Sequence, residues 1–330
     1  MKKIAIILYT ALTLLSIASC TDLKEEVLNE QDESETISDT SNAGSIVAPA
    51  YAYLRDLQSR SGVWLVLEML TDEMVFPTRG TDWNYPNYRT LFTHEYDSKN
   101  TYIKNTWNSF MLGITKCNVA LQYLTKLEQT EEVKNYVNET LFIRALCMYH
   151  LMDCFGHFPM REYTETDYSK LPVILEREQA LNRIITELET IIPQLKEKGE
   201  VPYGRITKAA AQLLLAKVYL NYQVYTGTAP TFADGQSKWT ETIDLCDDII
   251  GSGKYTLSTD FWKLYLADNQ KESDATETIL PIIFNNAIGL KGIPWLNITL
   301  HYNQKFGSFT SIWNGCCTTP TFLATWDTTD

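Results

Sequence analysis

Three aromatic residues, Trp83, Tyr85 and Tyr88, lie within one short, polar stretch of the chain. The polar residues among them are Asp82, Asn84 and Asn87. Sugar rings present C–H faces that can stack on indole and phenol rings, while amide and carboxylate groups can hold sugar hydroxyls. Residues 71–96 show no helical period, which predicts a long loop, and long loops inside a compact domain are usually functional. These residues are therefore candidates for binding a glycan.

A second aromatic set lies in the irregular stretch near the C-terminal end of the sequence. Its rings are Trp295, Tyr302 and Trp313, and the amides beside them are Asn297, Asn303 and Gln304. The alternative for each ring in both sets is packing onto the helices. We expect Trp83, Tyr85 and Trp295 to contribute to one shallow stacking platform. Removing Trp83 should then weaken binding and leave stability nearly unchanged.

Cys147, His150 and Cys154 are spaced three and four residues apart, so their side chains would share one helical face. Such a face could supply part of a metal site. Zinc, however, usually takes ligands from more than one element and needs a fourth ligand or an open position, and nothing nearby completes that set. We expect a packed helix face, with no metal and no other cofactor.

No feature of the sequence argues for catalysis. The G-x-S-x-G, H-E-x-x-H, P-loop and G-x-G-x-x-G motifs are absent. A glycoside hydrolase needs two carboxylates roughly 5–10 Å apart, and with 41 acidic residues such pairs arise by chance. We expect a protein that is not an enzyme. A secreted hydrolase is the alternative from a different class.

A positive start and a short apolar run precede Cys20, with the sequence Ile17-Ala18-Ser19 directly before it. The run is too short for an ordinary transmembrane helix and matches an export signal. It is similar to the lipobox of a bacterial lipoprotein, in which the signal (residues 1–19) is removed and the cysteine is acylated. Two or more acyl chains anchor a protein stably. We therefore expect lipidation at Cys20, followed by an acidic, flexible tether over residues 20–45.

The chain of 330 residues has 41 acidic and 28 basic residues, a net charge of −13. Such a surface repels phosphate backbones, which makes nucleic acid a poor partner. Of the six cysteines other than Cys20, four fall in helical patterns and should be free, and a bridge between the adjacent Cys316 and Cys317 would be strained. We expect no disulfide framework.

Apolar residues recur every three or four positions in several segments, which predicts amphipathic helices. They are expected over residues 44–70 with a break near 61–62, about 105–124, 137–155, 181–195, 208–222 and 239–250. Trp107 and Trp239 lie on these stripes and should be core, Asn118 should hydrogen-bond to backbone, and Thr207 should cap a helix. Residues 277–286 could form a strand, and the rest is loop-like. The pattern predicts paired antiparallel helices in a right-handed array.

Four stretches, in order, carry a family resemblance. Residues 139–159 match E-x4-RA-x5-L-x3-[FY]G-x2-P, residues 204–220 match GR-x-TK…LLAKVYL, and residues 239–257 and 314–330 match two further segments. With Cys20, they resemble the SusD/RagB family of outer-membrane nutrient-binding lipoproteins. Glu139 and Arg144 of the first motif are interpreted as structural, in an ion pair or a cap.

The resemblance implies a mainly α fold of tetratricopeptide-like helix pairs over residues 46–330, with an irregular, loop-rich ligand face. It implies a non-enzymatic, lipid-anchored protein of the outer membrane, exposed at the cell surface, that binds glycans. Its partner would be a TonB-dependent barrel transporter of the SusC type. Binding of peptide or glycoprotein fragments is the alternative in the same fold. Family chains continue well past residue 330, so this one would be truncated at its C-terminal part.

Overall fold

The computed structural model describes residues 39–59, 61–266, 268–271, 276–285, 287, 295–304, 312–327 and 329. Cys20, the predicted signal and most of the predicted tether lie outside the described residues. The first described helices begin at Thr40 and Ala43. No described helix combines the length and the apolar content needed to cross a membrane.

Most of the described chain up to residue 251 is helical, and helices arise where the apolar period predicts them. They are α3 (Ala43–Tyr53), α4 (Val63–Met69), α6 (Thr101–Leu124), α7 (Glu131–Phe155), α8 (Arg177–Ile191), α9 (Lys208–Leu220) and α11 (Trp239–Gly251). Shorter helices are η1 (Thr40–Asn42), η2 (Leu54–Gln58), α5 (Pro86–Phe92), η3 (Ile192–Gln194), α10 (Tyr222–Thr226), η4 (Phe261–Tyr265), α12 (Trp295–Thr299) and α13 (Pro320–Leu323). Within the described residues, four strands form two small antiparallel sheets, β1 (Met74–Val75) with β4 (Cys317–Thr318) and β2 (Phe158–Met160) with β3 (Val173–Leu175).

Local signals fix the helix ends. The Asn100 side chain accepts from the backbone N–H of Tyr102 and caps α6, and Thr130 caps α7 in the same way. A capping box formed by Glu176 and Gln179 starts α8. The predicted end of α7 at Gly156 is confirmed. Thr207 does precede α9, but its hydroxyl lies 3.4 Å from the hydroxyl of Tyr255 and makes no capping bond.

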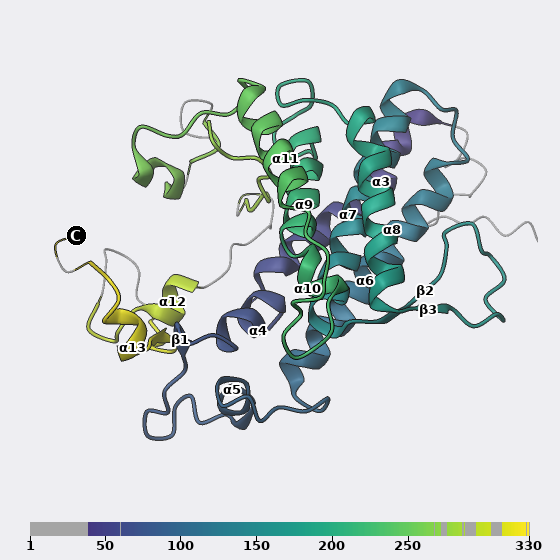
Figure 1. Cartoon of the computed structure of the whole chain (residues 1–330). Coiled ribbons are helices and arrows are strands. Elements are labelled where there is room, and N and C mark those ends of the chain that lie inside the picture. Colours follow the sequence, from purple (N-terminus) through teal and green to yellow (C-terminus); the bar gives the residue numbers. More distant parts are fainter. Residues whose placement is uncertain are drawn as a thin grey trace, which may run out of the picture.

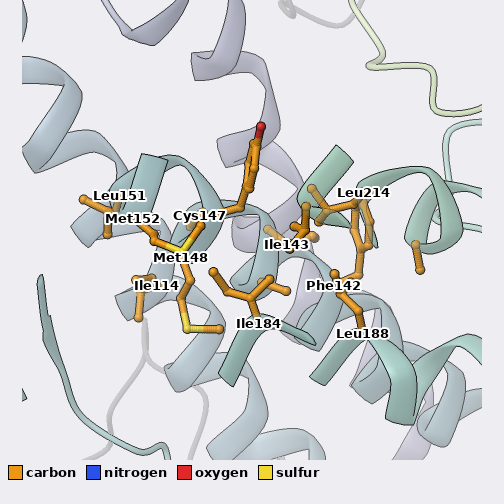
Figure 2. Close-up of a cluster of buried hydrophobic side chains, with 14 of the residues drawn as sticks. Ile114, Phe142, Ile143, Cys147, Met148, Leu151, Met152, Ile184, Leu188 and Leu214 are labelled. Carbon is orange, nitrogen blue, oxygen red and sulfur yellow. The ribbon is translucent and has the colours of Figure 1, made fainter. Parts of the chain in front are cut away.

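Helices that follow one another in the chain pack as neighbours: α6 on α7, α7 on α8, α8 on α9, and α9 on α11 (Figure 1). We call this set the helical stack. Its core is a continuous apolar cluster in which α7 lies centrally, between α6, α8 and α9 (Figure 2). The mainly α prediction is confirmed, while the tetratricopeptide character of the pairs stays a prediction.

Three expectations from the sequence are wrong. Residues 71–96 contain β1 and α5, and Pro86 at the first position of α5 is a helix-start signal that a seven-residue helix makes easy to miss. Described residues 276–285 form no strand, because Ile279, Leu280 and Ile282 pack irregularly against the main core. Trp239 is 55% exposed, because α11 turns its 242/245/249 face towards the stack.

Trp107 and the six cysteines behave largely as expected. Trp107 is half-buried, with its ring edge-on to Phe155 at 5.1 Å. All six described cysteines are free thiols, and Cys117 and Cys147 are buried in the core. His150 stacks on Phe110 at 4.8 Å. Among the described residues, no group of three or more potential ligands could hold a metal ion.

Candidate ligand-binding site

A pocket of about 580 Å³ gathers most of the predicted aromatic residues beside the helical stack. It is lined by Ser61, Asp82, Trp83, Tyr85, Tyr88, Tyr102, Tyr302, Ile312 and Trp313. We call it the aromatic pocket. Its walls come from three places in the chain: the break before α4, the segment from residue 82 into α6, and the segment after α12.

Two contacts hold these distant segments together. Strands β1 and β4 pair in antiparallel register, with Met74 opposite Thr318. The guanidinium of Arg79 donates to the carbonyls of Asn314 and Gly315, both at 2.8 Å. Gly315 permits the close approach, since a Cβ there would lie 2.8 Å from both Trp83 and Ile298. The Asn314-Gly315 motif is therefore a packing requirement of the pocket wall.

Trp83 lines the aromatic pocket and is half-buried. Its indole N–H donates to the carbonyl of Trp313 at 2.9 Å, and its ring lies 5.2 Å from Phe76. The backbone at Trp83 has φ of +57°, a region that bulky residues rarely adopt. Packing and this hydrogen bond hold it there, and these contacts argue against the expectation that Trp83 contributes little to stability, which stays a prediction.

Tyr88 is 7% exposed and belongs to the small apolar cluster under the pocket. Its ring stacks on Phe76 at 4.3 Å and on Tyr102 at 5.0 Å. It lies on α5, whose apolar face turns inward to meet α4 and α6. Tyr88 therefore packs against its neighbours. This is the alternative to ligand binding that the sequence leaves open for each aromatic residue.

Tyr85 and Tyr302 are the solvent-facing rings of the aromatic pocket, 60% and 42% exposed. The hydroxyl of Tyr302 donates to the Asp82 carboxylate at 2.9 Å. This hydrogen bond raises the pKa of Tyr302, so the phenol stays protonated and remains the donor. The rim thus presents apolar ring faces next to a fixed carboxylate acceptor.

Trp295 does not line the aromatic pocket in the described structure. Its ring packs against Trp64 at 3.9 Å, and its indole N–H donates to the carbonyl of Gln58 at 3.1 Å. The predicted platform therefore pairs Trp83 and Tyr85 with Tyr302 and Trp313 in place of Trp295. The cause is the start of α12, which directs Trp295 towards α4 and η2.

Ser61, Tyr102 and Ile312 line the pocket and were not among the predicted residues. Tyr102 lies in the first turn of α6, where the Asn100 cap marks the helix start but gives no sign of the pocket. Ser61 lies at the predicted helix break. These three lining residues are identified only by contacts between segments far apart in the sequence. No local sequence pattern encodes such contacts.

The motif residues Glu139 and Arg144 lie in the helical stack and are structural, as interpreted, but they do not pair with each other. Five positions along a helix turn the chain by about 140°, so the two point apart. Fully buried Glu139 accepts from Arg205 at 2.7 Å and from Tyr51 at 2.6 Å, and burial raises its pKa. The second and first family motifs are thereby joined.

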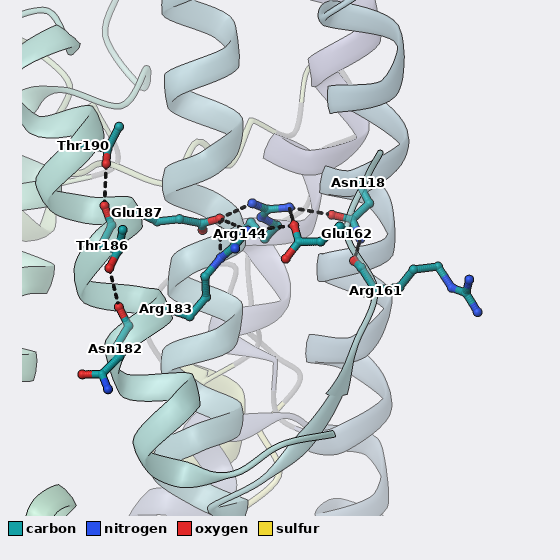
Figure 3. A network of polar contacts seen from close by, with 9 residues as sticks. All are labelled: Asn118, Arg144, Arg161, Glu162, Asn182, Arg183, Thr186, Glu187 and Thr190. Carbon is teal, nitrogen blue, oxygen red and sulfur yellow. Dashed lines mark hydrogen bonds and ion pairs between the residues drawn. The ribbon is translucent and has the colours of Figure 1, made fainter. Parts of the chain in front are cut away.

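Arg144, also buried, forms an ion pair with Glu187 of α8 and donates to Asn118 of α6 at 3.1 Å (Figure 3). Asn118 in turn donates to the backbone carbonyl of Arg161 at 2.8 Å, which confirms its predicted backbone bond. Glu162 and Arg183 extend the network towards solvent. Three helices and the segment directly after β2 are thus tied at one point.

The family described as "Starch-binding associating with outer membrane" (SusD-like) matches residues 26–220, more than half of the chain. The chain belongs to the SusD-like family. This match covers Trp83, Tyr85 and Tyr88 but not the second aromatic set.

Two curated relatives agree with the assignment. The starch-binding protein SusD of Bacteroides thetaiotaomicron is 33% identical over 182 residues, which are 54% of this chain and 31% of SusD. The SusD-like protein P25 of Formosa agariphila is 24% identical over 262 residues, 70% of this chain and 46% of P25. The matched regions cover 31% and 46% of those two proteins, so this SusD-like chain spans less than half of either.

Solved structures establish the fold. A SusD superfamily protein from Parabacteroides distasonis superposes with a TM-score of 0.71 at 22% identity, covering 91% of this chain and 61% of that one. Surface glycan-binding protein A from Bacteroides thetaiotaomicron, in complex with laminarihexaose, superposes with a TM-score of 0.66 at 17% identity, covering 88% and 62%.

Proposed function

We propose that this SusD-like protein binds oligosaccharides in the aromatic pocket and passes them to an outer-membrane transporter. The observation that carries the proposal is the juxtaposition of exposed Tyr85 and Tyr302 with Trp83, Trp313 and the Asp82 carboxylate around one pocket. Rings supply stacking faces for sugar C–H groups, and the carboxylate accepts hydroxyl protons. The pocket is wide enough for part of an oligosaccharide.

Relatives support the ligand class. SusD is named a starch-binding protein, and solved relatives are described as laminarin-binding or carry laminarihexaose. Peptide or glycoprotein fragments are the alternative ligands within the same fold.

The anchoring and transport steps extend this proposal. Acylation at Cys20 would hold the protein at the outer membrane, exposed at the cell surface. A SusC-type TonB-dependent barrel would receive the bound sugar. The family description supports association with the outer membrane. We infer that the protein binds its ligand without cleaving it.

Calorimetric titration with maltohexaose and laminarihexaose tests the pocket. Tyr85→Ala should weaken binding of the oligosaccharide that the wild type binds, by about 1–3 kcal/mol if stacking on bases is taken as the scale. Tyr168→Ala is the matched control, because Tyr168 is 70% exposed but lies in the β2–β3 hairpin away from the pocket. Equal effects of the two substitutions would count against the pocket.

Two further experiments test the anchor and the partner. Cys20→Ala should release the protein from membranes or leave its precursor unprocessed, and an acylated mutant in the outer-membrane fraction would contradict the anchor. Mild detergent extraction of the wild type should co-purify a large barrel protein.

Product analysis after incubation with either hexaose separates binding from hydrolysis, since a hydrolase would yield shorter sugars.

A further inference from the structure

Among the described residues that line the aromatic pocket, Asp82 is the one with a carboxylate side chain, and none has a basic side chain. The others are serine, isoleucine, tyrosine and tryptophan side chains. Asp82 is exposed, and its carboxylate accepts the Tyr302 hydroxyl at 2.9 Å. A carboxylate has about four acceptor positions, so this bond leaves most of them open towards a ligand.

No cation of the described chain forms an ion pair with this carboxylate. Arg79 is joined to Asp82 by two backbone hydrogen bonds, 2.9 and 3.0 Å long, but its guanidinium donates to the carbonyls of Pro77, Asn314 and Gly315. Those bonds tie the two walls together and orient the guanidinium towards the backbone. The net charge of the whole chain, −13, adds to the negative potential at the rim.

We propose that Asp82 is a specificity-determining residue, which makes the pocket select sugars without negative charge over sugars that carry carboxylates or sulfates. This inference rests on the proposed function. Hydroxyl groups of a neutral sugar can donate to Asp82, and such bonds to a charged acceptor are strong. A uronate or sulfate placed there meets a like charge a few ångströms away, a repulsion that disfavours binding by about tenfold in a partly solvated site.

The test uses two matched pairs of ligands with the wild-type chain. Maltohexaose and laminarihexaose are each titrated unmodified and after oxidation of their hydroxymethyl groups to carboxylates, at low ionic strength. Wild type should bind the unmodified hexaose roughly tenfold more tightly than its oxidised form. Raising the salt concentration to about 1 M shortens the screening length to about 3 Å and should narrow the ratio.

The variant Asp82→Asn should reduce that ratio to near one at low salt, because the amide keeps an acceptor for Tyr302 and removes the charge. Asp244→Asn is the control. Asp244 is an exposed residue of α11, outside the pocket lining, and its replacement changes the net charge equally. Melting temperatures establish that both variants fold, and the salt dependence of the wild type needs no variant.

Each outcome is decisive. A wild-type ratio near one, or a ratio unchanged in Asp82→Asn, overturns the specificity role while leaving sugar binding intact. If Asp244→Asn reduces the affinity ratio as much as Asp82→Asn does, the effect comes from net charge, and the specificity role of Asp82 is overturned as well. Absence of binding to both unmodified hexaoses overturns the proposed function, and the inference with it.

Discussion

In the helical stack, neighbouring helices follow one another in the chain, whereas the aromatic pocket joins residues such as Trp83 and Trp313, 230 positions apart. The stack is tied by buried ion pairs on α7, and the pocket by a two-residue strand pair and hydrogen bonds to backbone carbonyls. Burial is deep in the first region, while the second leaves rings exposed. The comparison separates residues that hold the fold from residues available to a ligand.

The largest effect is expected at Glu139. Glu139→Ala removes a fully buried carboxylate and leaves the Tyr51 hydroxyl and the buried side of the Arg205 guanidinium without their acceptor, so the free energy of unfolding should fall by about 3–5 kcal/mol. Urea titration measures it. Glu132 is the control, because it pairs with the same Arg205 from the same helix at 2.6 Å but is largely exposed. Glu132→Ala should cost less than about 1 kcal/mol. Similar losses would show that burial does not set the contribution.

The next effect concerns pH and again belongs to the stack. Burial lowers the pKa of His150 from 6.5 to about 4, with Lys217 as a further cause. Between pH 6.5 and 4 the His150 imidazole is protonated in the unfolded chain but stays neutral in the folded chain. Acidification to pH 4 should therefore remove about 3 kcal/mol of the free energy of unfolding through this group.

The variant His150→Phe keeps the ring that stacks on Phe110 and has no group to titrate. Its stability should therefore decline less than that of the wild type between pH 6.5 and 4, as measured by urea midpoints. His157→Gln serves as the control, since His157 is exposed just beyond the same helix. Parallel wild-type and His150→Phe profiles would contradict the prediction.

A smaller effect on stability is expected at Trp83, where the two regions meet in one residue. Trp83→Ala should lower the free energy of unfolding by about 2 kcal/mol, roughly half the cost of a fully buried tryptophan, and should also weaken oligosaccharide binding. Trp239→Ala is the control, because Trp239 is 55% exposed and should change stability by under about 1 kcal/mol. A stability loss without any binding loss would make Trp83 a packing residue alone.

The tryptophans also show what sequence could predict. The helices of the stack follow from a local apolar period, which also predicts the buried role of Asn118. The end of α7 follows from its glycine, Gly156, and the structural roles of Glu139 and Arg144 from the family resemblance. The period identifies an apolar stripe on a helix but not which face of the helix packs against another helix. The prediction that Trp239 lies in the core is therefore wrong.

The pocket was predicted in part. The structure brings Asp82, Trp83 and Tyr85 of the first predicted set together with Tyr302 and Trp313 of the second. The sequence predicts the two sets separately and expects Trp295 to join them. Whether an aromatic side chain outside the long helices faces solvent depends on residues elsewhere in the chain. Tyr88 stacks on Phe76 and Tyr102, and Trp295 packs against Trp64. No local pattern encodes those contacts.

The smallest effect is expected for Tyr302→Phe, which removes one hydroxyl from an exposed ring. Stability should change by less than about 0.5 kcal/mol, because the bond to Asp82 lies at the surface. Affinity for the hexaose that the wild type binds should fall by about two- to tenfold, the range of one net hydrogen bond, since Asp82 would lose the donor that positions it. Tyr302→Ala removes the ring as well and should weaken binding further, with stability again little changed. If the two variants lose equal affinity in the same titration, the hydroxyl is the whole contribution and Tyr302 is no stacking surface; the pocket would then depend on Tyr85 and the tryptophans alone.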